Sequence, residues 1–127
     1  MKKISLSKHR DVLIRLAVGA VFLSEGIQKF LFPELRGAGR FAEIGLPFAE
    51  SLGYTIGGLE VLSGALILIG YRVHQVAVVP AMIMLGAIVL TKVPILVDDG
   101  FWAMAHHIRT DWAMLLASLY LLLRPGR

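Results

Sequence analysis

Hydrophobic and polar positions alternate along the chain in long blocks. Four mostly apolar blocks approach the length of roughly 20 residues that a helix needs to cross the hydrocarbon core of a bilayer. They are residues 12–32, 51–70, 76–97 and 106–123, and the longest polar stretch between them is 33–50. The pattern predicts an all-α membrane protein built as a bundle of four transmembrane helices.

The fourth block is the least regular of the four. Only residues 112–123 are cleanly apolar, and that stretch is too short to span a bilayer. Extending it back to His106 gives an adequate length and places Asp111 inside the membrane. The alternative is a half-spanning or re-entrant element. We expect a full span, because backbone groups left unpaired in lipid are costly.

The composition agrees with a membrane protein. Of the 127 residues, 57% are hydrophobic and only 17% are charged, whereas a soluble domain of this length needs more polar residues to cover its surface. No repeat, low-complexity tract or long linker divides the sequence, so we expect one domain over residues 1–127. The first apolar block lacks the cleavage site of a signal peptide and is expected to stay in the mature chain.

Lysine and arginine are unevenly distributed between the two ends of the predicted helices. Seven lie in the two tails and in the turn between the second and third helices, and three lie in the other loops. The seven are Lys2, Lys3, Lys8, Arg10, Arg72, Arg124 and Arg127, and the three are Arg36, Arg40 and Arg109. The positive-inside rule therefore predicts that both termini are cytoplasmic. Orientation and anionic lipid head groups explain the net charge of +4, so no nucleic-acid partner is needed.

Several polar and charged side chains interrupt the apolar blocks and form a candidate intramembrane cluster. Its members are Arg15, Glu25, Gln28, Lys29, Glu60, Lys92 and Asp111. At 3.6 residues per turn, the charged members in the first block lie on or beside a glycine-containing stripe of the helix. Glu60 shares a stripe with Gly57 and Gly64 in the second block. Glycine lets helices approach closely, so we expect the two stripes to face each other.

Buried charges of this kind need partners. An unpaired charge at mid-membrane costs at least about 2.5 to 3.5 kcal/mol. The candidate pairs are Glu25 with Lys29 at the favourable i,i+4 spacing, Glu60 with Arg15 or Lys29, and Asp111 with Lys92 or Arg109. These pairs either hold the helices together or line a polar cavity that opens toward the outer surface. The sequence leaves both possibilities open.

Candidate metal and redox residues are few. The sequence has no cysteine, which excludes disulfides, thiolate metal sites and dithiol chemistry. His107 and Asp111 have the spacing of two metal ligands on one helix, but this signal is weak. A bis-histidine haem is not expected, because His74 and His106 fall at opposite surfaces. With no autonomous catalytic constellation, the sequence leaves open whether the protein is an enzyme, and electron transfer requires a bound partner.

Prolines and the first loop add three local expectations. Pro80 predicts a kink in the cytoplasmic half of the third helix, since proline removes a backbone hydrogen bond. Pro94 predicts a frayed last turn. The stretch 33–50 mixes apolar and charged residues ahead of a GLP sequence, and it is either a short interfacial helix or a plain surface loop.

Four sequence pieces together resemble the DoxX family of small four-helix membrane proteins. They are RLAVGAVFLSEGIQKF in the first helix, F-x-x-x-GLP in the loop, GGLEVLSGALILIG in the second helix, and a C-terminal PGR. The most specific parts are a G-x-x-K motif and a G-x-x-E-x-x-x-G motif that contains Glu60. Two features depart from the family pattern. The acidic residue that opens the last helix is usually Glu and here is Asp111, and many members carry a longer tail after PGR.

The resemblance implies a multi-pass protein of the bacterial cytoplasmic (inner) membrane. It favours an accessory subunit of a quinone-linked or oxidative-stress oxidoreductase system, with a quinone-like molecule in the polar cluster. The expected partners are the lipid bilayer, a redox protein and a second copy of the chain. One alternative is a small-molecule or proton-coupled transporter in which Glu60 changes protonation. The other is a membrane scaffold or chaperone in which the buried charges only join helices.

Overall fold

A computed structural model of the chain describes residues 6–123. Within this range the chain is helical throughout, with short turns and no strand. The elements are α1 (Leu6–Leu31), α2 (Pro33–Arg36), α3 (Ala38–Glu43), α4 (Ala49–Ile69), α5 (Val73–Val76), α6 (Val78–Ala87), the π-helix η1 (Ile88–Lys92), α7 (Val93–Asp99) and α8 (Phe101–Leu123). The all-α prediction is therefore confirmed for this part of the chain.

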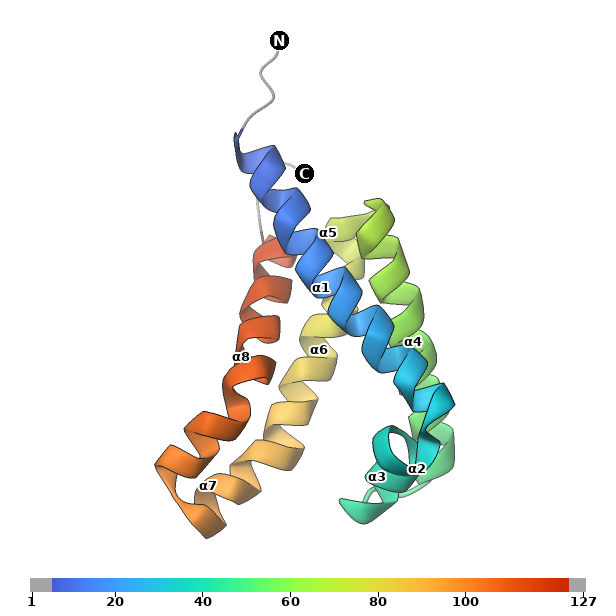
Figure 1. Cartoon of the computed structure of the whole chain (residues 1–127), viewed down its shortest axis with the longest axis vertical. Helices are drawn as coiled ribbons and strands as arrows, with labels where there is room; N and C mark the ends of the chain where they lie inside the picture. Colours follow the sequence, from blue (N-terminus) through green and yellow to red (C-terminus); the bar gives the residue numbers. More distant parts are fainter. Residues whose placement is uncertain (1–5, 124–127) are drawn as a thin grey trace.

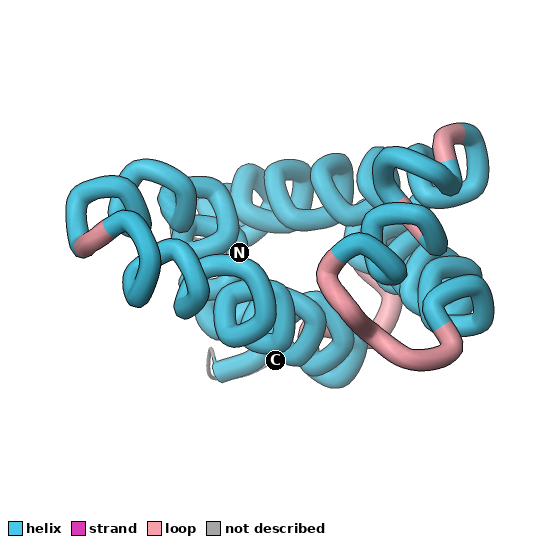
Figure 2. Tube along the Cα trace, turned by 90° about the horizontal axis from the view of Figure 1, so that it is seen from below, coloured by secondary structure: helices cyan, strands magenta, loops and turns pink. Residues whose placement is uncertain are grey.

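The long helices form two antiparallel pairs. α1 packs along α4, and the α5–α7 segment packs along α8. Figure 1 shows that the pairs converge where α1 begins and α8 ends, and that they diverge toward α3 and α7. Seen from the divergent end, the helix backbones form a ring (Figure 2). The described ends of the chain, where α1 begins and α8 ends, both lie at the convergent end.

Two described helical segments are long and apolar enough to cross a membrane. They are α4 and the segment Val73–Asp99, which comprises α5, α6, η1 and α7. α1 has 26 residues and α8 has 23, so both are also long enough, but they carry more polar and charged side chains. α8 is continuous from Phe101, five residues before the predicted boundary, and the structure does not show a re-entrant element there.

Glycine allows the close contact between α1 and α4. A Cβ atom added to Gly64 would lie 2.5 Å from the backbone nitrogen of Leu23, and one added to Gly26 would lie 2.6 Å from the carbonyl oxygen of Gly57. Real Cβ atoms do not tolerate such distances, so any larger residue would force the helices apart. The predicted contact between the two glycine stripes is confirmed.

The hydrophobic core lies toward the convergent end. Its fully or nearly buried members come from both helix pairs and are Val18, Phe22, Ile67, Val73, Ala77 and Leu121. Many other large apolar side chains are exposed on the outer faces of the helices, including Leu13, Leu62 and Leu123. An apolar exterior is what a helix bundle presents to lipid. The core therefore closes one end of the bundle and leaves the other end open.

Both prolines of the third predicted span mark interruptions. The helix breaks at Ala77, between α5 and α6, and the buried Pro80 lies in the first turn of α6. Proline lacks the N–H that would bond to the carbonyl of Val76, which accounts for the predicted kink. Pro94 lies in the first turn of α7, where no such donor is required. The helix continues to Asp99, so the predicted fraying at Pro94 is wrong.

The stretch 33–50 contains two short helices, α2 and α3, followed by a turn. The helical expectation for this stretch is confirmed, and the plain-loop alternative is wrong. α3 packs on α4 at Gly53, where an added Cβ atom would lie 2.5 Å from the backbone nitrogen of Ala38. Gly45 and Phe48 have positive φ angles of 89° and 54° and reverse the chain into α4. This packing holds α2 and α3 beside the open end of the bundle.

Candidate functional site

A cavity of about 760 Å³ lies between the two helix pairs, in the half of the bundle where they diverge. Side chains of α1, α4, α6 and α8 line it, together with residues of α2, α3 and η1. Most of the lining is apolar. Its charged members are Glu25, Lys29, Arg36, Arg40, Glu60, Lys92 and Asp111. Five of the seven residues predicted from the sequence thus meet at one cavity.

The most buried charges of the lining form an ion pair between α1 and α4. Lys29 Nζ lies 2.9 Å from Glu60 Oε1, and the two side chains are 9% and 2% exposed. Gly57 makes room for this contact, because a Cβ atom there would lie 3.1 Å from the Cβ of Lys29. Lys29 is therefore the partner of Glu60, as one of the two sequence alternatives predicted.

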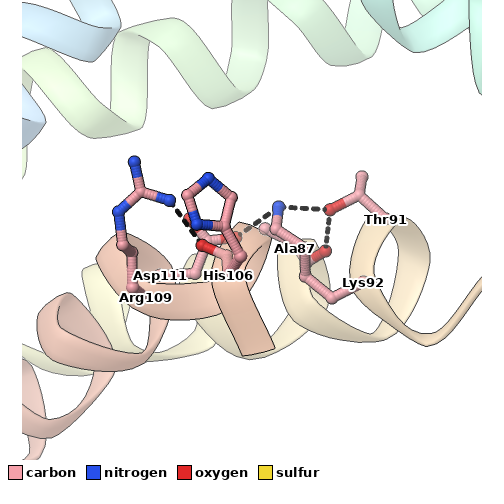
Figure 3. A network of polar contacts seen from close by, with 6 residues as sticks. All are labelled: Ala87, Thr91, Lys92, His106, Arg109 and Asp111. Carbon is pink, nitrogen blue, oxygen red and sulfur yellow. Dashed lines mark hydrogen bonds and ion pairs between the residues drawn. The ribbon is translucent and has the colours of Figure 1, made fainter. Parts of the chain in front are cut away.

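A second ion pair joins η1 to α8 on the opposite wall. Lys92 Nζ lies 2.9 Å from Asp111 Oδ2 and donates a hydrogen bond of 2.9 Å to Thr91 Oγ1. The Thr91 hydroxyl in turn donates to the carbonyl of Ala87, as Figure 3 shows. In a π-helix each backbone N–H bonds five residues back, so the carbonyl four residues back accepts the hydroxyl instead. Lys92 thus reaches from η1 to α8, and Thr91 connects its ammonium to the carbonyl of Ala87.

Arg109 and the adjacent histidines do not contribute to this pair. Arg109 donates to the backbone carbonyl of His106 (Figure 3) and not to Asp111. His106 and His107 are exposed, with ring centroids 5.4 Å apart. Among the residues that the structure describes, no three His, Asp or Glu side chains are close enough together to hold a metal ion. His107 and Asp111 thus gain no third ligand within that range.

Glu25 lines the cavity without a hydrogen bond or an ion pair to any residue that the structure describes. The predicted pair with Lys29 is wrong, because the Lys29 ammonium reaches across to α4 instead. Glu60 is the more deeply buried of the two carboxylates and loses more hydration, so it gains more from a fixed counter-charge. Glu25 is left as an acceptor group that faces the cavity.

Two predicted site residues lie outside the cavity. Arg15 donates from Nε to the carbonyl of Ile67 at 3.1 Å and from Nη2 to the carbonyl of Leu68 at 3.2 Å. These carbonyls lie in the last turn of α4, where the regular helical N–H partners end and the Ile67 carbonyl accepts from the Gly70 N–H at 3.2 Å. They can therefore accept from Arg15, which is held away from Glu60. Gln28 donates to Ser24 Oγ at 2.9 Å on the outer side of α1. Neither residue lines the cavity.

Sequence reasoning missed the arginines that α2 and α3 bring to the rim of the cavity. Arg36 and Arg40 are exposed there, and Arg40 lies 3.5 Å from Glu43. Their position depends on the packing of α3 against Gly53. Gly53 lies in α4 outside the contact between α4 and α1. It was the signal in the sequence that the stretch 33–50 folds back onto α4.

Comparison with known proteins identifies the family. A family model described as DoxX matches residues 11–93. The chain belongs to the DoxX family. It is 49% identical over 124 residues to a protein of Mycobacterium tuberculosis named "Uncharacterized membrane protein Rv3486", an alignment that covers 91% of this chain and 76% of that protein.

A second relative of this DoxX protein carries a more specific name. The chain is 29% identical over 119 residues to the "Putative oxidoreductase CatD" of Bacillus subtilis, covering 91% of this chain and 79% of the relative. No solved structure matches the chain. The family and the first relative establish a membrane protein.

Proposed function

We propose that this DoxX protein is an accessory subunit of an oxidoreductase system in the bacterial cytoplasmic membrane, and that its cavity holds a quinone-like molecule. The observation that carries the proposal is the cavity itself. It is mostly apolar and lies between two ion pairs contributed by opposite walls of the bundle. Sites for small molecules usually combine an apolar lining with a few fixed polar groups.

The same proposal includes four membrane spans with both termini in the cytoplasm. The antiparallel arrangement of the long helices supports the even number of crossings (Figure 1). The excess of lysine and arginine at the tails and at Arg72 supports the orientation. With this orientation the cavity opens in the half of the bundle remote from the cytoplasm.

Interhelical adhesion alone does not account for the cavity. The closest helix contact, between α1 and α4, is made by glycines and needs no space around it. The Lys92 and Asp111 pair joins η1 to α8 within the other helix pair. Neither ion pair connects one helix pair to the other, so both leave the space between the helix pairs open. This arrangement favours binding over a purely structural role.

The proposed redox role assigns electron transfer to a partner protein. A chain without cysteine has no thiol couple of its own. The name of the Bacillus subtilis relative, which refers to an oxidoreductase, supports a role in a redox system. We therefore expect the ligand to exchange electrons with a second protein that docks on this subunit.

Native mass spectrometry of the gently solubilised protein tests the proposal. Met82 on α6 lines the cavity, and Met82→Trp should place a bulkier side chain there that obstructs the ligand. Leu85 lies on the same helix, is 49% exposed and does not line the cavity, so Leu85→Trp is the matched control. We expect a small molecule to remain with the wild type and Leu85→Trp and to be lost from Met82→Trp. An empty wild type, or equal retention by all three, would contradict the proposal.

A further inference from the structure

Most charged groups of the cavity lining have a charged partner. Lys29, Arg36, Arg40 and Lys92 are basic, and Glu25, Glu60 and Asp111 are acidic. Arg40 pairs with Glu43, which lies outside the lining, so Arg36 and Glu25 are the charges of the lining without an ion pair among the described residues. Among the acids, Glu60 and Asp111 have lysine partners at 2.9 Å. Glu25 is the acidic group of the lining that has no partner within the described residues.

An ionised carboxylate only accepts hydrogen bonds. Glu25 is partly buried on α1, in a lining that is largely apolar, and a polar group withdrawn from water is costly unless a donor reaches it. Neither lysine is available, because both are held by other carboxylates, and neither Arg36 nor Arg40 forms an ion pair with Glu25. The missing donor must therefore come from water or from the molecule that occupies the cavity.

The surroundings of Glu25 select among possible donors. Arg36 at the rim disfavours a cationic ligand, such as an amine, through repulsion between like charges. An anionic head group would in turn meet Glu25 as a like charge. A neutral hydroxyl satisfies both conditions, because it donates to Glu25 and adds no charge.

The remaining lining specifies the rest of the ligand. Apolar side chains of α4 and α6, among them Leu59, Val78 and Met82, line the cavity and are exposed. They fit a hydrocarbon tail, whose burial contributes roughly 25 cal/mol per Å².

We propose that Glu25 accepts a hydrogen bond from a hydroxyl on the head group of the ligand, so that the cavity binds the reduced, hydroquinone form in preference to the oxidised, quinone form. This inference rests on the proposed function, since it names the state of the quinone-like ligand. A quinone carbonyl is itself an acceptor and would face the carboxylate without a hydrogen between them. Each tenfold preference for the reduced form raises the two-electron potential of the bound couple by about 30 mV.

Equilibrium binding to the full chain in lipid nanodiscs tests the inference. The probes are decylhydroquinone and decylbenzoquinone under anaerobic conditions, and the redox-inert pair 4-nonylphenol and its methyl ether. We expect the wild type to bind the hydroxyl-bearing member of each pair at least about tenfold more tightly, consistent with a hydrogen bond to a charged group. Glu25→Gln, which can both donate and accept, should reduce the ratio to below about threefold.

Gln28→Glu is the matched control, because Gln28 lies one turn or less from Glu25 on the outer side of α1 and should leave the ratio unchanged. Glu25→Asp keeps the acceptor and should retain part of the preference. Equal affinities of the wild type for both members of a pair, or an unchanged preference in Glu25→Gln, would overturn the inference and leave the proposed function standing. Binding of none of the four probes would reject both. If Glu25→Gln does not fold, the comparison of the phenol with its ether on the wild type still decides whether the cavity prefers a ligand that carries a hydroxyl.

Discussion

Lys29 Nζ on α1 lies 2.9 Å from Glu60 Oε1 on α4, and neither side chain is more than 9% exposed. The pair lies beside the glycines that bring α1 and α4 together, at the wall of the cavity. Each charge depends on the other, because little water reaches either one. Because of this dependence, we expect the loss of one partner to lower stability more here than at the Lys92 and Asp111 pair.

Glu60→Gln should destabilise the protein by about 3 to 5 kcal/mol, since it leaves the buried Lys29 ammonium without a counter-charge. Unfolding in detergent micelles, followed by circular dichroism, measures the loss. The double variant Lys29→Met with Glu60→Met removes both charges and should recover most of the lost stability. A double variant as unstable as Glu60→Gln would show that the two side chains act independently.

Asp111→Asn provides a comparison on the opposite wall. Its partner Lys92 is 15% exposed and Asp111 is 20% exposed, so water can hydrate the lysine when the carboxylate is removed. We therefore expect a smaller loss of stability than for Glu60→Gln in the same assay. An equal or larger loss would mean that the second pair is as poorly hydrated as the first.

The helices and their closest contact were predictable because both depend on regular spacing. Apolar blocks of membrane-spanning length locate α4 and the α5–α7 segment, and glycines at helical intervals identify the faces of α1 and α4 that meet. The contact of Lys29 with Glu60 follows once these faces are in register. Depth along the helix placed Lys92 and Arg109 level with Asp111, and the structure selects Lys92.

The partners of Arg15 and Glu25 were not predictable from helix faces. Arg15 shares a stripe with Lys29, but carbonyls in the last turn of α4 attract it, and that turn is defined only by the structure. Glu25 has an ideal i,i+4 spacing to Lys29, but a more buried carboxylate on another helix takes the lysine. For Lys29 a contact between helices thus prevailed over a local one, and for Arg15 one contact with α4 replaced another. The rim arginines depend likewise on how α3 folds back onto α4.

Gly64→Ala should destabilise the bundle, whereas Gly58→Ala should not. A Cβ atom at Gly64 would lie 2.5 Å from the backbone nitrogen of Leu23, while one at Gly58 would meet nothing within 4 Å. Backbone cannot yield as a flexible side chain does, so we expect a loss of about 1 to 3 kcal/mol at Gly64. At Gly58 the higher helix propensity of alanine predicts no loss. Equal behaviour of the two variants in thermal unfolding would contradict the close contact between α1 and α4.

Arg15→Met should lower stability by about 1.5 to 3 kcal/mol, because it removes a charged donor from two carbonyls at the end of α4. Arg15→Lys keeps the charge but not the planar fork, so its loss should be intermediate. Chemical denaturation in detergent gives both values. A lysine variant as stable as the wild type would mean that charge, and not the paired geometry, is what α4 requires. Neither variant should alter ligand retention, since Arg15 lies outside the cavity.

Single cysteines test the proposed four spans and their orientation, because the natural sequence has none. Tyr71→Cys places a thiol in the connection between α4 and α5, and Asp99→Cys places one at the end of α7, where both residues are exposed. A membrane-impermeant maleimide should label Asp99→Cys in intact cells and Tyr71→Cys only after the membrane is opened. Labelling of both from the same side would contradict a third span between them, and the reverse pattern would contradict cytoplasmic termini. Because the cavity opens on the side of α7, the same result decides from which face of the membrane a partner protein can reach the ligand.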